Sequence, residues 1–166
     1  MYDTFGSFKW FINLFGIHLF PTLIVNLCLF PLYFYFIENS TSVGSLDYLI
    51  CLFTFSMVLL EQISDEQMHT FKRNITNKDR TMNHGLWQYS RHPNYLGEVG
   101  FWFGLCGFGL IGSNGSLILL ICPIAMLLMF MFASIPMMDN RSLENRPDYA
   151  EYMKKTSSLM ILPIKK

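Results

Sequence analysis

The chain has 166 residues, of which 52% are apolar and 14% are charged. Soluble domains usually carry about 25% charged residues, so this composition excludes an ordinary soluble globule and indicates a membrane protein. The formal net charge is zero. Without a basic stripe or a nucleic-acid motif, the sequence also excludes a nucleic-acid-binding protein. The length fits one membrane domain, residues 1–166.

Four apolar runs predict an all-α fold, a multi-pass transmembrane helical bundle with about four spans. They are Leu19–Ile37, Leu46–Leu60, Val99–Gly112 and Leu117–Ile135. The first and last runs would form helices about 28 Å long, close to the roughly 30 Å hydrocarbon core. The two middle runs are shorter and must borrow flanking residues or lie against protein. Strands are excluded because an open sheet edge cannot face lipid.

The basic residues fall in three places: before the first run, between the second and third runs, and after the fourth. With four spans, these places lie on one side of the membrane, and the positive-inside rule makes that side cytosolic. We therefore expect both termini and the polar segment 61–98 in the cytosol. The membrane would be the endoplasmic reticulum in a eukaryote and the inner membrane in a bacterium.

The four cysteines each lie inside an apolar run, and none forms a Cys-x-x-Cys pair. A zinc site or a disulfide framework needs convergent, accessible thiols. We therefore predict no metal site and interpret Cys28, Cys51, Cys106 and Cys122 as small core residues.

A polar helix is predicted to continue the second apolar run beyond Leu60. Its residues Gln62, Asp65, His69 and Lys72 follow at i, i+3, i+7 and i+10 and so share one helical face. That face carries an acid, an imidazole and an amine. Spacing alone leaves two interpretations open: a solvated amphipathic helix on the membrane surface, or one wall of a ligand site.

A second polar element precedes the third apolar run. Pro93 suits the first turn of a helix, where its missing N–H costs nothing. Arg91 and His92 would then lie at the positive end of that helix, which favours an anion such as a phosphate. Asn94 and Glu98 are four residues apart and share a helical face, so they can hydrogen-bond to an amide, a ring or a ribose.

The same element also fits an aromatic belt at the membrane surface. Trp87, Tyr89, Tyr95 and Trp102 would anchor the helix at the interface, and Arg91 would extend toward the headgroups. The belt and a ligand site are compatible with each other.

Glycines give the third run a face of small residues, formed by Gly100, Gly104 and Gly107. Such a face lets another helix approach closely, and we interpret it as a site of tight helix packing.

Three motifs, in order, resemble the steroid 5α-reductase C-terminal family of membrane reductases, also called the DUF1295 family. They are EQISDEQMHTFK, GLWQYSRHPNYLGE and the tail RPDYAEYMKKTSSLMILP. The resemblance covers residues 46–163. It implies NADPH as the cofactor and an oxidoreductase that reduces a carbon–carbon double bond in a lipid-like or steroid-like enone.

The resemblance also implies cofactor contacts. Asp65, Asn94 and Glu98 match positions that contact the dinucleotide in the family, and Lys72 falls where a basic residue contacts phosphate. The expected cofactor-binding residues are Asp65, Lys72, Arg91, His92, Asn94, Tyr95 and Glu98. Further candidates near the tail are Asp139, Arg141 and Tyr149.

No catalytic residue is predicted. In the steroid reductases an N-terminal portion supplies a Glu and a Tyr that polarise the substrate carbonyl, and this chain has no match to it. A truncated or non-catalytic member that keeps the fold is therefore a rival hypothesis. Another rival is a methyltransferase of the isoprenylcysteine carboxyl type, which shares an Arg-His-Pro-x-Tyr-x-Gly element and binds S-adenosylmethionine. Glu98 and the Asp-x-Gln helix favour the reductase.

Overall fold

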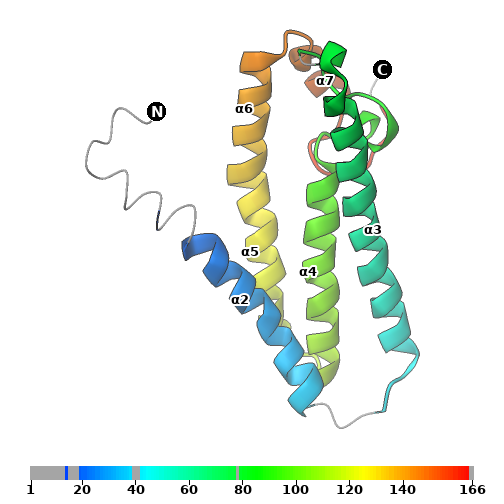
Figure 1. Cartoon of the computed structure of the whole chain (residues 1–166). Coiled ribbons are helices and arrows are strands. Elements are labelled where there is room, and N and C mark those ends of the chain that lie inside the picture. The colour runs from blue at the N-terminus through cyan, green and yellow to red at the C-terminus, as the bar shows by residue number, and fades with distance from the viewer. Residues whose placement is uncertain (1–13, 15–18, 39–41, 78, 165–166) are drawn as a thin grey trace.

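Long helices packed side by side make up the computed structural model of the chain, and short helices and loops gather at one end (Figure 1). The structure describes residues 14, 19–38, 42–77 and 79–164. Within these residues there is no β-strand, only one isolated bridge between Ser90 and Ser157. The predicted all-α bundle is confirmed.

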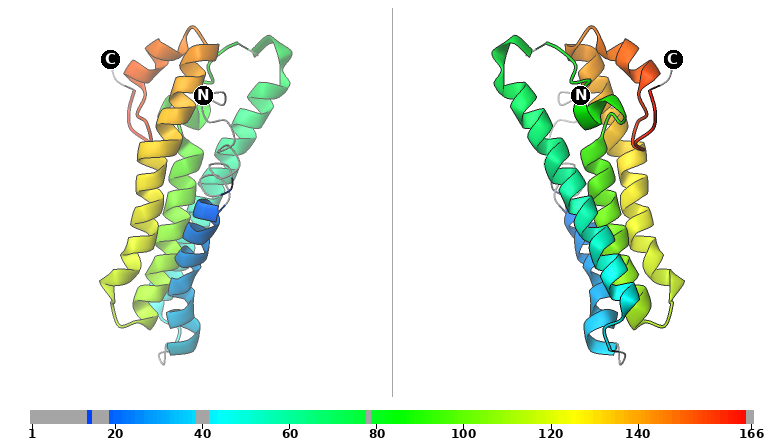
Figure 2. Two further views of the ribbon diagram at one scale, coloured as in Figure 1. Left: turned by 90° about the vertical axis from the view of Figure 1, so that its left-hand side faces the viewer. Right: turned by 90° about the vertical axis from the view of Figure 1, so that its right-hand side faces the viewer.

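The helices follow the apolar runs of the sequence. In chain order they are α2 (Phe20–Tyr33), α3 (Ser45–Arg73), α4 (Pro93–Gly112), α5 (Ile121–Met129), α6 (Ile135–Asn145) and α7 (Tyr149–Lys155). Short helical turns lie between them: the π-helical η4 (Phe34–Glu38) and η8 (Phe130–Ser134), and the 3-10 helices η5 (Ile75–Asn77), η6 (Gly85–Gln88) and η7 (Leu117–Leu120). Because η7, α5, η8 and α6 are contiguous, they form one long rod (Figure 2).

Three helices of the described chain are long and apolar enough to cross a membrane: Ser45–Arg73, Pro93–Gly112 and Leu117–Asn145. The first predicted span corresponds to a shorter apolar helix, Thr22–Ile37. The short middle runs do borrow flanking residues, because α3 continues to Arg73 and α4 begins at Pro93. These helices fit an integral, multi-pass membrane protein.

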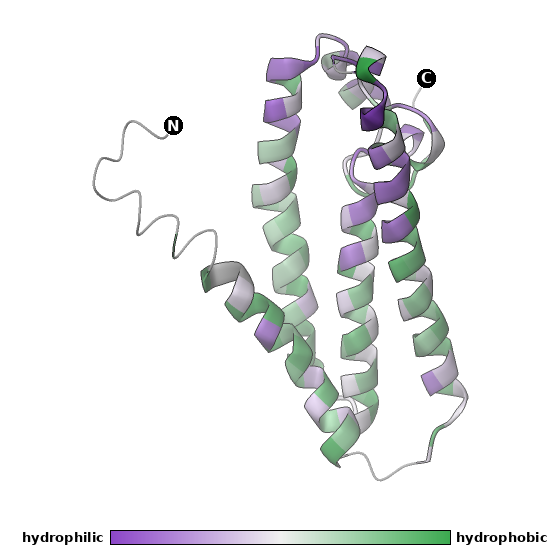
Figure 3. Ribbon diagram, in the orientation of Figure 1, coloured by the Kyte–Doolittle hydropathy of each residue, from purple (hydrophilic) through white to green (hydrophobic). Residues whose placement is uncertain are grey.

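Polar and apolar residues separate along the bundle. Polar residues gather where α3 ends, where α4 begins and where α6 ends, and apolar residues dominate the rest of the rods (Figure 3). Only 6% of the most apolar stretch of α3 is buried within the chain, so its outer face is available to lipid. The chemistry-bearing side chains are therefore concentrated at one end.

α4 lies at the centre of the bundle, with α3 on one side and α2 and α5 on the other. The core cluster contains residues of α2, α4, α5 and η8, including Trp102 and Phe130. Cys28 and Cys106 are 1% exposed and belong to the core as predicted, and Cys28 also lies against Cys122. Cys51 is exposed on α3, so its prediction as a core residue is wrong. The run around Cys51 is apolar because this face of α3 is turned away from the other helices, where lipid can cover it.

The predicted glycine face of α4, formed by Gly100, Gly104 and Gly107, packs directly against α3, and Gly97 extends this face toward the start of α4. A Cβ added to Gly97 would lie 2.7 Å from the backbone N of Glu61 and 2.8 Å from the carbonyl O of Met57. At Gly107 the nearest atoms belong to the Ile50 side chain, at 3.2 Å or more. The contact at Gly97 is thus backbone against backbone, and it fixes the polar end of α4 relative to that of α3.

Replacing Gly97 should therefore separate the two helices. We expect Gly97→Ala to lower the melting temperature in detergent, with a cost of about 1–3 kcal/mol, because the backbone of α3 cannot move aside as a side chain can. Gly107→Ala is the matched control, since the Ile50 side chain can rotate and alanine favours the helix. Equal melting temperatures for the two variants would contradict the close backbone contact.

Candidate cofactor site

A cavity of about 170 Å³ lies at the polar end of the bundle, between α3, the beginning of α4, α6 and the first half of α7. Most of the residues predicted to bind a cofactor line it: Asp65, Lys72, Arg91, His92, Asn94 and Tyr95. Glu98 is not in its wall and lies one turn farther along α4. Of the tail candidates, Tyr149 lines the cavity, whereas Asp139 lies behind the wall and Arg141 is exposed.

The loop before α4 is fastened to α3. Gly85 has a φ of +62°, a left-handed conformation that favours glycine. This turn lets the backbone N–H of Leu86 donate to Gln67 Oε1 at 2.9 Å, and the indole N–H of Trp87 donate to the carbonyl of Ser64 at 3.0 Å. The Gln of the predicted Asp-x-Gln helix thus holds the loop, and Asp65, two residues earlier, remains in the cavity wall.

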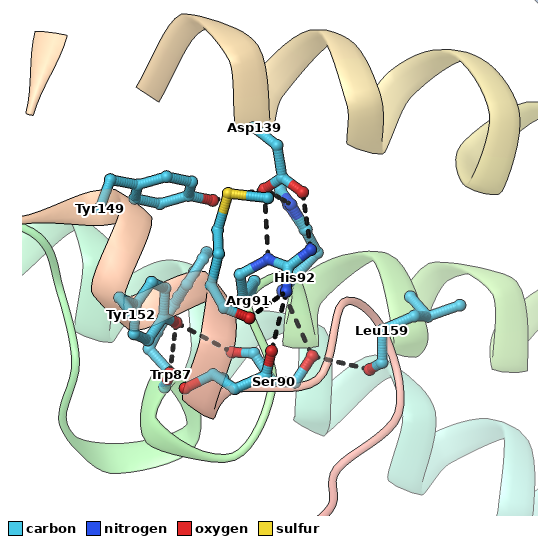
Figure 4. A network of polar contacts seen from close by, with 10 residues as sticks. Trp87, Ser90, Arg91, His92, Asp139, Tyr149, Tyr152 and Leu159 are labelled. Atoms are coloured by element: carbon cyan, nitrogen blue, oxygen red, sulfur yellow. Dashed lines mark hydrogen bonds and ion pairs between the residues drawn. The ribbon is translucent and has the colours of Figure 1, made fainter. Parts of the chain in front are cut away.

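A buried carboxylate, Asp139 of α6, organises the end of this loop (Figure 4). Arg91 donates from Nη2 to Asp139 Oδ2 at 2.8 Å, and His92 Nε2 lies 3.1 Å from Asp139 Oδ1. The Tyr149 hydroxyl also donates to Asp139 Oδ1. A second guanidinium nitrogen of Arg91 donates to the carbonyl of Thr156 at 2.8 Å. Arg91 and His92 are therefore held rigidly in the wall, and their part in cofactor binding stays a prediction.

The tail after α7 runs back along the same loop. The Ser90 hydroxyl, which is completely buried, donates to the carbonyl of Leu159 at 2.7 Å. The N–H of Leu162 donates to the carbonyl of Tyr89 at 3.2 Å. The tail is therefore fastened to the loop, and the two tyrosines of the Tyr-x-x-Tyr motif, Tyr149 and Tyr152, line one side of the cavity.

Titratable groups of α7 and its cap are shifted by this packing. Burial raises the pKa of Tyr149 and of Tyr152, and the neighbouring Asp139 carboxylate adds to the rise at Tyr149. Both phenols thus stay protonated at neutral pH and act as donors. Partial burial opposes ionisation of Asp148, but hydrogen bonds from the Thr81 hydroxyl at 2.6 Å and amide at 3.1 Å outweigh it and lower the pKa of Asp148.

One buried acceptor in the cavity wall has no partner. Asn94 Oδ1 is inaccessible to solvent and accepts no hydrogen bond from the described residues. Buried polar atoms in proteins are nearly always hydrogen-bonded. Asn94, which lines the cavity, therefore has an acceptor that the described chain leaves unused.

Two larger hollows adjoin the cavity and differ in charge. One, of about 460 Å³, is lined by Lys72, Arg73 and Arg146, and shares Lys72 and Arg146 with the cavity. The other, of about 440 Å³, is lined by Glu61 and Asp65, and shares Asp65 with the cavity. Along α3 the site therefore changes from acidic, next to the apolar part of the bundle, to basic at the outer end.

Comparison with known proteins gives the family. Residues 1–156 match the family described as proteins of unknown function, DUF1295. The chain belongs to this DUF1295 family. The family predicted from the three motifs is thus confirmed, while its steroid 5α-reductase-like character rests on the motifs alone.

This member of the DUF1295 family has a relative in fission yeast. The uncharacterized protein C594.04c of Schizosaccharomyces pombe is 30% identical over 131 residues, which cover 66% of this chain and 38% of the relative. The chain thus matches well under half of the length of that relative. No solved structure matches the chain described here.

Sequence reasoning missed two features of the site. Arg146 in the cavity wall was not predicted, and Asp139 was expected near the cofactor rather than as the anchor of the wall. The available signal for Asp139 was a lone carboxylate four residues beyond the end of the last apolar run, at Ile135. Its partners come from distant segments, which no local spacing reveals.

Removing the charge of Asp139 should loosen this end of the protein. We expect Asp139→Asn to destabilise the fold by about 3 kcal/mol, because the Arg91 side chain, only 10% exposed, would be left without its counter-charge. The measurement is thermal unfolding in detergent, together with protease cleavage of the tail. Glu144→Gln, an exposed change on the same helix, is the control. A melting temperature as high as that of the control would contradict the anchoring role.

Proposed function

We propose that this chain is an NADPH-dependent membrane reductase module that acts on a carbon–carbon double bond in a lipid-like enone. The observation that carries the proposal is the convergence of the predicted cofactor residues on one cavity whose wall contains the unpartnered Asn94 Oδ1. The resemblance of the three motifs to membrane reductases supplies the reaction class.

The residues present fit a dinucleotide. The cavity alone, at about 170 Å³, takes only part of such a ligand, and the adjoining hollows extend it in both directions. The basic end suits phosphate groups, whereas Asp65 and Asn94 supply acceptors for ribose hydroxyls or a carboxamide. When bound, NADPH supplies the hydride.

The protein contributes position and exclusion of water. Tyr95 stacks on His92 with ring centroids 5.1 Å apart, and His92 is held by Asp139. The Tyr95 hydroxyl forms no hydrogen bond within the described part of the chain, so it is available to a ligand in the cavity. The apolar rods next to this end would receive the lipid-like substrate and keep water from the reacting groups.

We assign the polar end of the bundle to the cytosol. The described basic residues of the loops and the tail lie at this end, which the positive-inside rule favours for the cytosolic face; Lys9 lies outside the described residues. The cofactor would then enter from the cytosol.

Labelling of single cysteines tests this orientation. In a background with the native cysteines replaced, we expect a membrane-impermeant maleimide to label Asn74→Cys in intact microsomes, whose cytosolic face is outward. Ser42→Cys, at the opposite end of α3, should be labelled only after permeabilisation. The reverse pattern would contradict the assigned orientation.

Cofactor binding tests the function itself. The purified protein in detergent should bind NADPH, and Asn94→Ala should weaken binding about three- to ten-fold, the value of one neutral hydrogen bond. Asn140→Ala, an exposed change on α6, should bind like wild type. Binding of S-adenosylhomocysteine in place of NADPH would favour the methyltransferase, and wild-type protein that binds neither would contradict a catalytic function.

A further inference from the structure

The tail beyond α7 exposes a strip of apolar side chains at the polar end of the bundle. Met160, Ile161, Leu162 and Ile164 are between 40% and 57% exposed, whereas Leu159, just before them, is 4% exposed and holds the tail to the protein. None of these four exposed side chains lines the cavity. Because exposed apolar side chains that cluster in this way mark a contact surface, residues 160–164, here the tail strip, require a partner.

Hydrogen bonds place the tail strip beside the start of a membrane-spanning helix. The N–H of Arg91 donates to the carbonyl of Ser157 at 2.8 Å, and the N–H of Leu162 donates to the carbonyl of Tyr89 at 3.2 Å. α4, which is long and apolar enough to cross a membrane, begins at Pro93, directly after this loop. The tail therefore turns back from α7 toward the apolar part of the bundle (Figure 2) and lies where α4 enters the bilayer.

The aromatic belt predicted from the sequence does not fill this level. Trp87 and Trp102 are 7% and 8% exposed, so both are packed inside the protein. The ring of Tyr95 packs on His92 and on Phe130. Tyr89 is the one aromatic side chain of that prediction that is exposed. Tyr89 and the tail strip therefore supply the interfacial surface that the two tryptophans do not.

The charge of the tail suits phospholipid headgroups. From Tyr152 to the end of the chain the sequence has no acidic residue, and its charged residues are Lys154, Lys155, Lys165 and Lys166. Lys155 pairs with Glu151, which leaves the tail with a net positive charge. Lysines next to apolar side chains are typical of segments that lie in a membrane interface, and the headgroups of the cytosolic leaflet are anionic.

We propose that the tail strip is a membrane anchor that lies in the lipid interface of the leaflet at the polar end of the bundle. Its apolar side chains meet the acyl boundary, and the lysines meet anionic headgroups. Because Tyr149 and Tyr152 precede the strip and line the cavity, the anchor fixes that wall of the cavity against the membrane. The anchor acts whatever ligand the cavity takes, so it does not rest on the proposed reductase function.

The accessibility of a spin label in liposomes tests the anchor. The full chain, with its native cysteines replaced, carries a nitroxide at Ile161→Cys and is reconstituted in phosphatidylcholine and phosphatidylserine. We expect the label to collide more with oxygen, which concentrates in lipid, than with a water-soluble nickel chelate, as at the outward-facing Leu52→Cys. A label at Asn83→Cys, exposed in the loop, should show the opposite preference. A label at residue 161 that behaves like the one at residue 83, or that neither reagent reaches, would overturn the anchor.

Proteolysis in the same liposomes tests whether lipid holds the tail in place. Trypsin cleavage after Lys155 requires the tail to detach, because Thr156 is buried and its carbonyl accepts a hydrogen bond from Arg91. Ile161→Asp should speed this cleavage at least about ten-fold, the value of one apolar side chain that leaves lipid. Ile75→Asp, at an 85% exposed apolar residue of the loop, should cleave like wild type. Equal cleavage of the two variants would contradict a lipid contact and leave the strip as surface for a cytosolic protein.

Discussion

The polar end of this protein depends on one buried carboxylate. A carboxylate that is 5% exposed is stable only with a cation and several hydrogen bonds around it, and Asp139 obtains them from Arg91, His92 and Tyr149. These residues belong to the loop before α4, to its N-cap and to α7. The hydrogen bonds to this one carboxylate therefore bring two segments onto α6: the loop that ends at the N-cap of α4, and α7.

This anchoring has a consequence for binding. Arg91 directs its guanidinium to Asp139 and to tail carbonyls, so it acts first as a part of the wall. Lys72 and Arg146 also line the cavity, but no hydrogen bond to a described residue holds their side chains. The close backbone contact at Gly97 holds α4 against α3, which keeps Asn94 opposite Asp65. The wall around Asp139 and Gly97 is thus held in place, whereas the basic side chains of Lys72 and Arg146 are less constrained.

The sequence predicted the class of fold because hydropathy reports burial in lipid directly, but it set element ends less well. The predicted continuation of the second run as a polar helix is confirmed, since α3 runs to Arg73. The prediction ended the fourth run at Ile135, although that helical rod runs to Asn145, because polar residues continue a helix as readily as apolar ones. Helical spacing correctly grouped Asp65 with Lys72. The network of Asp139 and the position of Arg146 stayed hidden, since they depend on contacts between distant segments. Cys51 was misplaced for another reason: an apolar run does not reveal which of its residues face lipid and which face the other helices.

The side-chain amide of Asn94 offers the most direct test of the central claim, that this end of the bundle encloses a nucleotide. In a protein labelled with ¹⁵N at asparagine, the Asn94 side-chain signal, assigned by its loss in Asn94→Ala, would be followed by NMR during titration with NADPH. The account predicts a saturable shift of that signal while the exposed Asn140 signal stays in place. An Asn94 signal that does not move at saturating NADPH, in folded protein, would contradict it.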